Sequence, residues 1–205
     1  MKAYIIENPQ QISDDELEAM INRLPHWRKT KALSLKNRTD SVNCAVTYLL
    51  LCKLLKENYA ISSPPEFSFG AHGKPYLKNH RSVFFSISHC KNAVACVIAN
   101  EQIGVDILDS RSISEGISKK ICTQAELLEL EKTPDRQKYL RKLWCIKESY
   151  SKMTGKGYSD GFTLIEHREL GKKSAFIDCE SYCVSVCSEA ELDGFSLEKI
   201  STDEI

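Results

Sequence analysis

The amino-acid sequence predicts an α+β fold, in which helices and strands form separate groups along the chain. The expected order is one helix, three strands, two helices and further strands, which differs from the alternation of a repeating βαβ unit. The 205 residues are enough for one large or two small domains, and 42% hydrophobic with 27% charged residues is typical of folded globular proteins. A junction near residues 100–102 would give two nearly equal parts, 1–101 and 102–205.

The first helix and the strands that follow it are indicated by hydrophobic spacing. Apolar residues between positions 40 and 57 recur at the three- and four-residue intervals of a helix, and we expect this helix to be buried. Short runs rich in β-branched and aromatic side chains then predict three strands, at residues 83–87, 93–99 and 103–107.

Two helices and further strands are expected in the second part. Thr123 followed three residues later by Glu126 predicts a helix that begins with a capping box. Thr133-Pro134 predicts the start of a long helix, with proline at the first helical position, and Gly155 predicts its end after about Thr154. Apolar runs in the remainder are interpreted as strands at residues 162–166, 174–177 and 182–187.

Charge, hydropathy and cysteine content argue against several classes of protein. The 28 Lys and Arg residues balance 28 Asp and Glu residues, which argues against a main role in coating nucleic acid. No apolar run approaches the ~20 residues of a membrane-spanning helix, and an acid at position 7 does not fit a signal peptide. The nine cysteines include no Cys-x-x-Cys pair, so we expect reduced thiols in a cytoplasmic protein that binds neither nucleic acid nor membrane.

Basic residues are concentrated early in this otherwise neutral chain. Residues 23–56 contain eight Lys and Arg side chains but only one acidic residue, Asp40. Such a segment is consistent with a local anion site, and on charge alone it is equally consistent with a solvated helix face.

Two acidic residues lie in sequence contexts that could support chemistry. Asp106 interrupts an apolar strand, where a carboxylate must be paired, bound to a metal or turned toward water. Glu148 lies one helical turn from Lys152, and both share a helix face with Trp144. A Glu–Lys pair at this spacing is common on exposed surfaces, but on an inward face it would need partners such as a metal and a phosphate.

Weaker signals come from a histidine and two glycine–lysine turns. His89 follows Ser88 at the end of an expected strand, where it could donate to a phosphate, although a structural histidine is more common. Neither Gly73-Lys74-Pro75 nor Gly155-Lys156-Gly157 fits the phosphate-binding P-loop pattern.

In their order along the chain, these motifs resemble the 4′-phosphopantetheinyl transferases of the pseudo-dimeric, surfactin-synthetase-activating (Sfp) type. The resemblance extends from about residue 24 to residue 166. The blocks at 104–107 and 144–157 are its specific parts, whereas the Gly-Lys-Pro turn is not specific. The motifs that carry it are Gly-Lys-Pro at 73–75, Phe-Ser-Ile-Ser-His at 85–89, Gly-Val-Asp-Ile at 104–107, Trp-x-x-Lys-Glu-Ser-x-x-Lys at 144–152 and Gly-Lys-Gly at 155–157.

The resemblance implies an enzyme that transfers the phosphopantetheine arm of coenzyme A to a serine of an acyl or peptidyl carrier protein. Mg²⁺ would be required, and adenosine 3′,5′-bisphosphate would be released. Proteins of this type have two similar α+β halves with coenzyme A in the cleft between them, and they are usually monomers. The resemblance leaves open whether the carrier belongs to fatty acid, polyketide or nonribosomal peptide biosynthesis.

By the resemblance, the first part supplies coenzyme A contacts and the second supplies the metal site and the catalytic helix. Asp106 and Glu148 match the magnesium-binding carboxylates, and Lys152 matches a lysine near the pyrophosphate. The predicted catalytic residues are therefore Glu148, Lys152 and Asp106. The residues predicted to bind coenzyme A are Arg28, Lys31, Lys74, Ser88, His89 and Lys147. The basic segment could also help to dock an acidic carrier protein.

The sequence departs from the family pattern at two positions. Leu108 occupies a place where some bacterial members carry a third acidic residue, and Asp109 follows it. Because strand residues alternate between faces, Asp109 is expected to point away from Asp106, which leaves two protein carboxylates for the metal. Asn43 replaces a frequent arginine, so one phosphate contact could be lost.

Two other functions are consistent with the same residues. A degenerate member of the family could bind coenzyme A or a carrier protein without turnover. A different Mg²⁺-dependent enzyme could cleave a pyrophosphate in the absence of any carrier. We prefer the transferase, because every expected catalytic position except the optional third acid is present.

Overall fold

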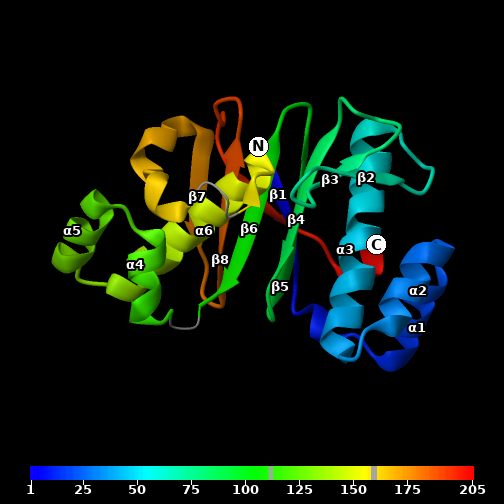
Figure 1. Ribbon diagram of the computed structural model, residues 1–205. Coiled ribbons are helices and arrows are strands. Elements are labelled where there is room, and N and C mark those ends of the chain that lie inside the picture. The colour runs from blue at the N-terminus through cyan, green and yellow to red at the C-terminus, as the bar shows by residue number, and fades with distance from the viewer. Residues whose placement is uncertain (111–112, 158–160) are drawn as a thin grey trace.

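A computed structural model describes residues 1–110, 113–157 and 161–205 of the chain. Two sheets lie face to face at its centre, and helices cover the outer side of each (Figure 1). The order of helices and strands confirms the predicted α+β class.

The first sheet has the strand order β4-β5-β1-β9. Its neighbouring strands are antiparallel, except that β9 runs parallel to β1. The strands are β1 (Lys2–Glu7), β4 (Phe84–His89), β5 (Ala93–Ala99) and β9 (Ser196–Lys199). The predicted strands at 83–87 and 93–99 are thereby confirmed.

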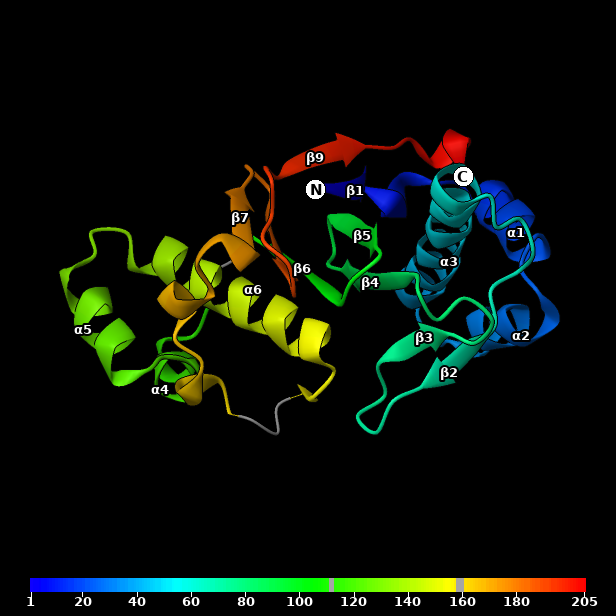
Figure 2. The ribbon, with the colours of Figure 1, turned by 90° about the horizontal axis from the view of Figure 1, so that it is seen from above.

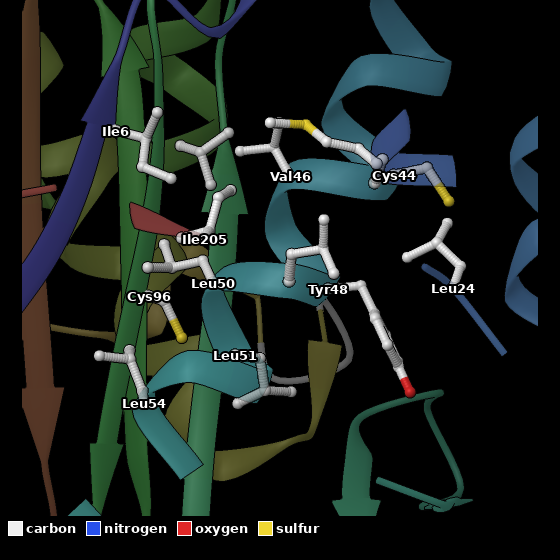
Figure 3. Packing of buried hydrophobic residues seen from close by; sticks show 14 of the residues in the cluster. Ile6, Leu24, Cys44, Val46, Tyr48, Leu50, Leu51, Leu54, Cys96 and Ile205 are labelled. Carbon is white, nitrogen blue, oxygen red and sulfur yellow. The ribbon is translucent and has the colours of Figure 1, made fainter. Parts of the chain in front are cut away.

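The long helix α3 (Arg38–Tyr59) covers the outer face of this sheet and confirms the buried helix expected at 40–57. Figure 3 shows its side chains, such as Leu50 and Leu54, directed toward Ile6 and Cys96 of the strands. Each fully buried leucine contributes roughly 1.5–3 kcal/mol, so this contact fixes α3 on the sheet. Helices α1 (Asp14–Asn22) and α2 (His26–Ser34) pack against α3 from outside (Figure 1).

The second sheet is antiparallel, with the order β6-β8-β7. It consists of β6 (Ile103–Asp109), β7 (Ser174–Asp178) and β8 (Tyr182–Ser188), which confirms three further predicted strands. Helix α6 (Arg136–Thr154) packs against β6 and β8, and two shorter helices lie beyond it (Figure 1). These are α4 (Ser118–Ile121) and α5 (Gln124–Lys132).

The two sheets share a core because strand residues alternate between faces. On β5, Ala93, Ala95 and Val97 face the second sheet, whereas Val94 and Cys96 pack against α3. Alternate residues of the facing strands β6 and β8 complete this core from the other side, among them Ile103, Val105, Ile107, Tyr182, Val184 and Val186.

The remaining strands form a small hairpin and a long-range pair. The hairpin consists of β2 (Phe67–Phe69) and β3 (Pro75–Leu77). Strand β9 returns from the second part of the chain to pair with β1 (Figure 2), and Ile200 and Ile205 join the core around α3. The last residues therefore pack against the first part, and the division near residue 101 stays a prediction.

Helix starts in the second part are set by capping residues. The capping box of Thr123 and Glu126 is confirmed at α5, with both of its hydrogen bonds present. The long helix begins at Arg136 rather than at Pro134, because the Asp135 side chain accepts a hydrogen bond from the Lys138 amide and caps it. Its end before Gly155, which has φ of 70°, is confirmed.

The strand predicted at 162–166 is wrong. Residues Phe162–Leu164 form a short 3-10 turn, and His167–Lys173 form another 3-10 segment. The backbone carbonyl of Phe162 accepts a hydrogen bond from Lys147 rather than from a neighbouring strand. Two further 3-10 turns lie at Pro9–Gln11 and Thr202–Glu204, and one lies at Glu115–Ile117.

The nine cysteines all lie in the described part of the chain, and each is a free thiol. None of the described helices is both long enough and apolar enough to cross a membrane.

Candidate active site

A cleft of about 730 Å³ opens between the helical side of the first sheet and the edge of the second. One wall comes from α2, α3, β4 and the β2–β3 hairpin, and the other comes from β6 and α6. Seven of the predicted site residues line this cleft: Arg28, Lys31, Ser88, His89, Asp106, Glu148 and Lys152.

Asp106 lies at the base of the cleft and is 6% exposed. It belongs to the β6 face that is turned toward α6, opposite to the apolar residues Val105 and Ile107. Its Oδ1 atom accepts hydrogen bonds from Ser88 Oγ at 2.8 Å and from Lys152 Nζ at 2.6 Å. These partners offset the cost of removing the carboxylate from water.

Helix α6 turns Trp144, Glu148 and Lys152 toward the same cleft. The structure therefore favours the inward-facing interpretation of the Glu–Lys pair over an exposed surface pair. Close packing of α6 on β6 depends on Gly104, where an added Cβ would lie 2.0 Å from the Ser149 carbonyl oxygen. The glycine two residues before Asp106 thus allows the helix to approach its carboxylate.

Arg28 and Lys31 line the opposite wall. The Arg28 guanidinium donates to the Cys44 carbonyl at 3.0 Å and lies 5.5 Å from the centre of the Tyr48 ring. Within the described residues, its buried Nε atom has no hydrogen-bond partner. A buried guanidinium nitrogen with unused donor capacity fits the binding of an anion.

Ser88 and His89 are the last two residues of strand β4, and both line the cleft. The pKa of His89 is lowered, chiefly because the ring is partly removed from water and also because of the nearby Lys152 charge. The ring therefore favours its neutral form. The Nδ1 atom of His89 lies 3.2 Å from Nδ2 of the Asn43 side chain.

Lys74 does not line this cleft, as its neighbours Gly73 and Pro75 do, but it lines a smaller pocket together with Glu148 and Lys152, and its predicted contact with coenzyme A stays a prediction. Its ammonium donates to the Met153 carbonyl at 2.6 Å and to Gln102 Oε1 at 2.8 Å. It thereby joins the β2–β3 hairpin to the last turn of α6. Burial lowers the pKa of Lys74 to about 8.

Lys147 lies outside the cleft, and we correct its predicted assignment to coenzyme A binding. Its side chain is fully buried on another face of α6. The ammonium pairs with Glu126 and also donates to the carbonyls of Ile121 and Phe162. With its hydrogen-bonding capacity used inside the protein, Lys147 cannot reach a ligand in the cleft.

A second acidic group, formed by Glu126, Glu166 and His167, lies beside Lys147. Its ligand atoms are close enough to surround a metal ion, and His167 Nδ1 lies 2.8 Å from Glu126 Oε1. However, the Lys147 ammonium already neutralises Glu126. Hydrogen bonds from His167 and Lys147 hold the pKa of Glu126 well below its usual range, at about 2, against the opposing effect of burial. We interpret this group as a structural ion-pair network.

Asp109 points away from Asp106, as strand alternation predicts. Its carboxylate accepts hydrogen bonds from the backbone amides of Lys91 and Asn92, at 3.4 Å and 3.3 Å. These amides belong to the turn between β4 and β5, so Asp109 contacts this turn and does not line the cleft.

The aromatic side of the cleft was missed by reasoning from the sequence. Trp27, Tyr48 and Phe67 line it, and their rings meet edge to face at centroid distances of 5.8–6.4 Å. These residues come from two helices and a hairpin, so no local spacing connects them. The position of Trp27 next to Arg28 was the one feature of the sequence that could have indicated this aromatic side.

Comparison with known proteins identifies the family to which this chain belongs. Residues 102–198 match the family model of the 4′-phosphopantetheinyl transferase superfamily. The chain is 33% identical to 4′-phosphopantetheinyl transferase gsp of Aneurinibacillus migulanus, over 77% of this chain and 67% of the relative. It belongs to the 4′-phosphopantetheinyl transferase superfamily.

Other members of the superfamily match over most of this chain. Identity with 4′-phosphopantetheinyl transferase Sfp of Bacillus subtilis (strain 168) is 28%, over 89% of this chain and 84% of that protein. The L-aminoadipate-semialdehyde dehydrogenase-phosphopantetheinyl transferase of Saccharomyces cerevisiae (strain ATCC 204508 / S288c) is 29% identical over 80% of the chain and 65% of that protein. The protein is thus a transferase of the Sfp type.

Proposed function

We propose that this phosphopantetheinyl transferase moves the 4′-phosphopantetheine arm of coenzyme A to a serine of an acyl or peptidyl carrier protein. The observation that carries the proposal is the convergence of two carboxylates and Lys152 in one cleft, facing a wall with Arg28 and Lys31. In this assignment residues 1–101 contribute most nucleotide contacts, and 102–205 contribute the metal site and the catalytic helix.

The donor atoms of the cleft fit a magnesium ion. Asp106 and Glu148 come from a strand and a helix and line the same cleft. Mg²⁺ prefers oxygen ligands and is often bound by one or two carboxylates, with phosphate oxygens and water in the other positions. Bound by these residues, the ion would neutralise negative charge on the pyrophosphate.

Coenzyme A carries negative charge at its pyrophosphate and at its 3′-phosphate. We assign the 3′-phosphate to Arg28 and Lys31, because these two residues of the basic segment line the cleft. Ser88 and Lys152 both hydrogen-bond to the Asp106 carboxylate, and His89 follows Ser88, so we assign these three residues to the pyrophosphate. Charged donors favour such contacts because a phosphate accepts several hydrogen bonds at once.

In the proposed reaction, Glu148 or a water molecule that it orients accepts the proton of the carrier serine. The serine oxygen then forms a bond to the β-phosphorus, and the bond from this phosphorus to the bridging oxygen breaks. Lys152 stabilises the negative charge of the leaving adenosine 3′,5′-bisphosphate. Most of the rate enhancement would come from positioning and electrostatic stabilisation.

Release of adenosine 3′,5′-bisphosphate tests this reaction against its alternatives. The protein should release it from coenzyme A only when Mg²⁺ and an apo carrier protein are both present, as followed by chromatography. Release without a carrier would instead indicate a pyrophosphate-cleaving enzyme. Binding of coenzyme A with no release, across fatty-acid and peptidyl carriers, would indicate a binding protein.

A further inference from the structure

Asn43 occupies an unusual place for a polar side chain, on the buried helix α3 and only 4% exposed. Its carboxamide lies between two side chains from other elements. Gln10 Nε2 donates to Asn43 Oδ1 at 3.1 Å, and Asn43 Nδ2 lies 3.2 Å from His89 Nδ1. Gln10 also reaches the Thr39 carbonyl, at 3.5 Å.

This chain of contacts fixes the direction of each hydrogen bond. Gln10 Nε2 faces two oxygen acceptors, so it is the donor to Asn43. Asn43 then presents its NH₂ group, which can only donate, to the histidine ring. His89 Nδ1 must therefore accept, and in a neutral imidazole the single proton lies on Nε2.

We propose that Asn43 is a positioning residue that holds His89 as the Nε2–H tautomer and presents this N–H to the cleft. His89 itself lines the cleft, next to Ser88 and close to Asp106 and Lys152. A neutral N–H donor there would bind an anionic oxygen without adding a second full positive charge beside Lys152. The inference rests on the proposed function for the identity of that anion, a phosphate group of coenzyme A.

The surrounding charges are consistent with a neutral ring. Partial burial of the ring and the Lys152 charge disfavour protonation of His89, and together they outweigh Asp40 and Asp106, which favour it. Without a fixed partner at Nδ1, a neutral imidazole could place its proton on either nitrogen. Asn43 excludes the tautomer that is protonated at Nδ1, because the Nδ1–H group would then face the NH₂ group of Asn43, and two hydrogen-bond donors cannot bond to each other.

The tautomer can be measured directly by two-bond ¹H–¹⁵N correlation spectra of the ¹⁵N-histidine-labelled protein, at a pH above the pKa of His89. Wild-type His89 should show an unprotonated Nδ1 and a protonated Nε2. Asn43→Leu, which keeps the approximate size of the side chain, should show a mixture of tautomers. Asn58→Leu is the matched control on the same helix, because Asn58 donates to the Leu54 carbonyl and should leave His89 unchanged. A wild-type ring protonated at Nδ1 would overturn the proposal.

Coenzyme A binding provides the second measurement. Asn43→Leu should weaken binding severalfold by calorimetry, whereas in a His89→Ala background it should have no further effect, since Asn43 acts through the ring. Full additivity of the two substitutions would show that Asn43 acts independently and would contradict the proposal. The spectra require neither coenzyme A nor turnover, so failure of the proposed function would leave the tautomer result intact.

Discussion

Asp106 and Lys152 form the ion pair at the centre of the proposed site, with their charged atoms 2.6 Å apart. The ammonium gives a nearly buried carboxylate its partner, and it also brings a cation to the place that we assign to the leaving phosphate. Glu148 lies one helical turn from Lys152 and lines the same cleft. In the proposed reaction, Glu148 would thus accept a proton, and Lys152 would stabilise the negative charge of the leaving phosphate.

Replacing Glu148 by Gln should reduce phosphopantetheine transfer at least about a hundredfold, because the amide can neither accept the serine proton nor bind a cation as a carboxylate does. The thermal unfolding midpoint should stay close to that of the wild type, since the substitution preserves shape. Glu57→Gln, an exposed change on α3 that removes the ion pair with Lys53, should keep full activity. A fully active Glu148→Gln protein would rule out the role assigned to this residue.

Single residues show where sequence reasoning succeeds and where it fails. The spacing of Trp144, Glu148 and Lys152 correctly predicts that they share one face of α6, and the structure shows that this face is turned toward the cleft. Lys147 belongs to the same motif, but successive helical residues point about 100° apart, so it cannot share that face. Its partner Glu126 lies 21 residues earlier, and nothing in the local sequence pairs the two. The role proposed for Asn43 likewise depends on contacts with residues of two other elements, Gln10 and His89.

Helix α6 is held at its C-terminal turn by residues from two other elements. Gly104 of β6 lets the helix backbone approach, and Lys74 of the β2–β3 hairpin region donates to the Met153 carbonyl. A cation at the C-terminal end of a helix is favoured by the helix dipole and by the unpaired carbonyls there. This turn carries Lys152, so the hairpin helps to set one side of the cleft.

Lys74→Met should therefore destabilise the protein by about 1.5–3 kcal/mol, the range for hydrogen bonds to a charged group. Amide hydrogen exchange over the last turn of α6 should become faster, as measured by mass spectrometry. Lys78→Met is the matched control, since this exposed hairpin lysine pairs with exposed Glu66. Equal exchange rates in the two variants would contradict the role assigned to Lys74.

The network of Glu126, Lys147 and His167 anchors another face of α6 in the interior. Lys147→Met leaves Glu126 buried without its ammonium partner and should cost about 3–5 kcal/mol in the free energy of unfolding. The double substitution Glu126→Leu/Lys147→Met should recover part of this loss, because no unpaired charge remains. Denaturant-induced unfolding measures the free energy of unfolding of the single and the double variant. A double variant no more stable than the single one would contradict this explanation.

The low pKa of Glu126 also gives a pH dependence. Its pKa in the folded protein is about 2, against 4.5 for an unperturbed glutamate, so the unfolded state binds more protons between these values. The stabilising contribution of Glu126 should be complete above about pH 4.5 and should be lost as the pH falls toward 2. Unfolding free energies measured over this range should fall more steeply in the wild type than in Glu126→Leu/Lys147→Met. Parallel curves would show that Glu126 does not contribute.

At the scale of the whole molecule, the two sheets meet through one apolar core, and the cleft is lined by β4 of the first sheet and β6 of the second together with the helices around them. The α+β class, the buried helix and five of the strands were predictable, because their hydrophobic spacing is local. The parallel pairing of β9 with β1 joins residues almost the full chain apart, so no local pattern indicates it. The apolar run at 162–166 resembles a strand, but the Phe162 carbonyl serves the Lys147 network instead.

The whole arrangement is most directly tested by the intact mass of an apo carrier protein after incubation with this protein, coenzyme A and Mg²⁺. We predict that the carrier gains the mass of one phosphopantetheine group, that the gain maps to a single serine, and that EDTA prevents it. An unchanged carrier mass across fatty-acid and peptidyl carriers, under conditions where calorimetry shows coenzyme A bound, would contradict the proposed transfer.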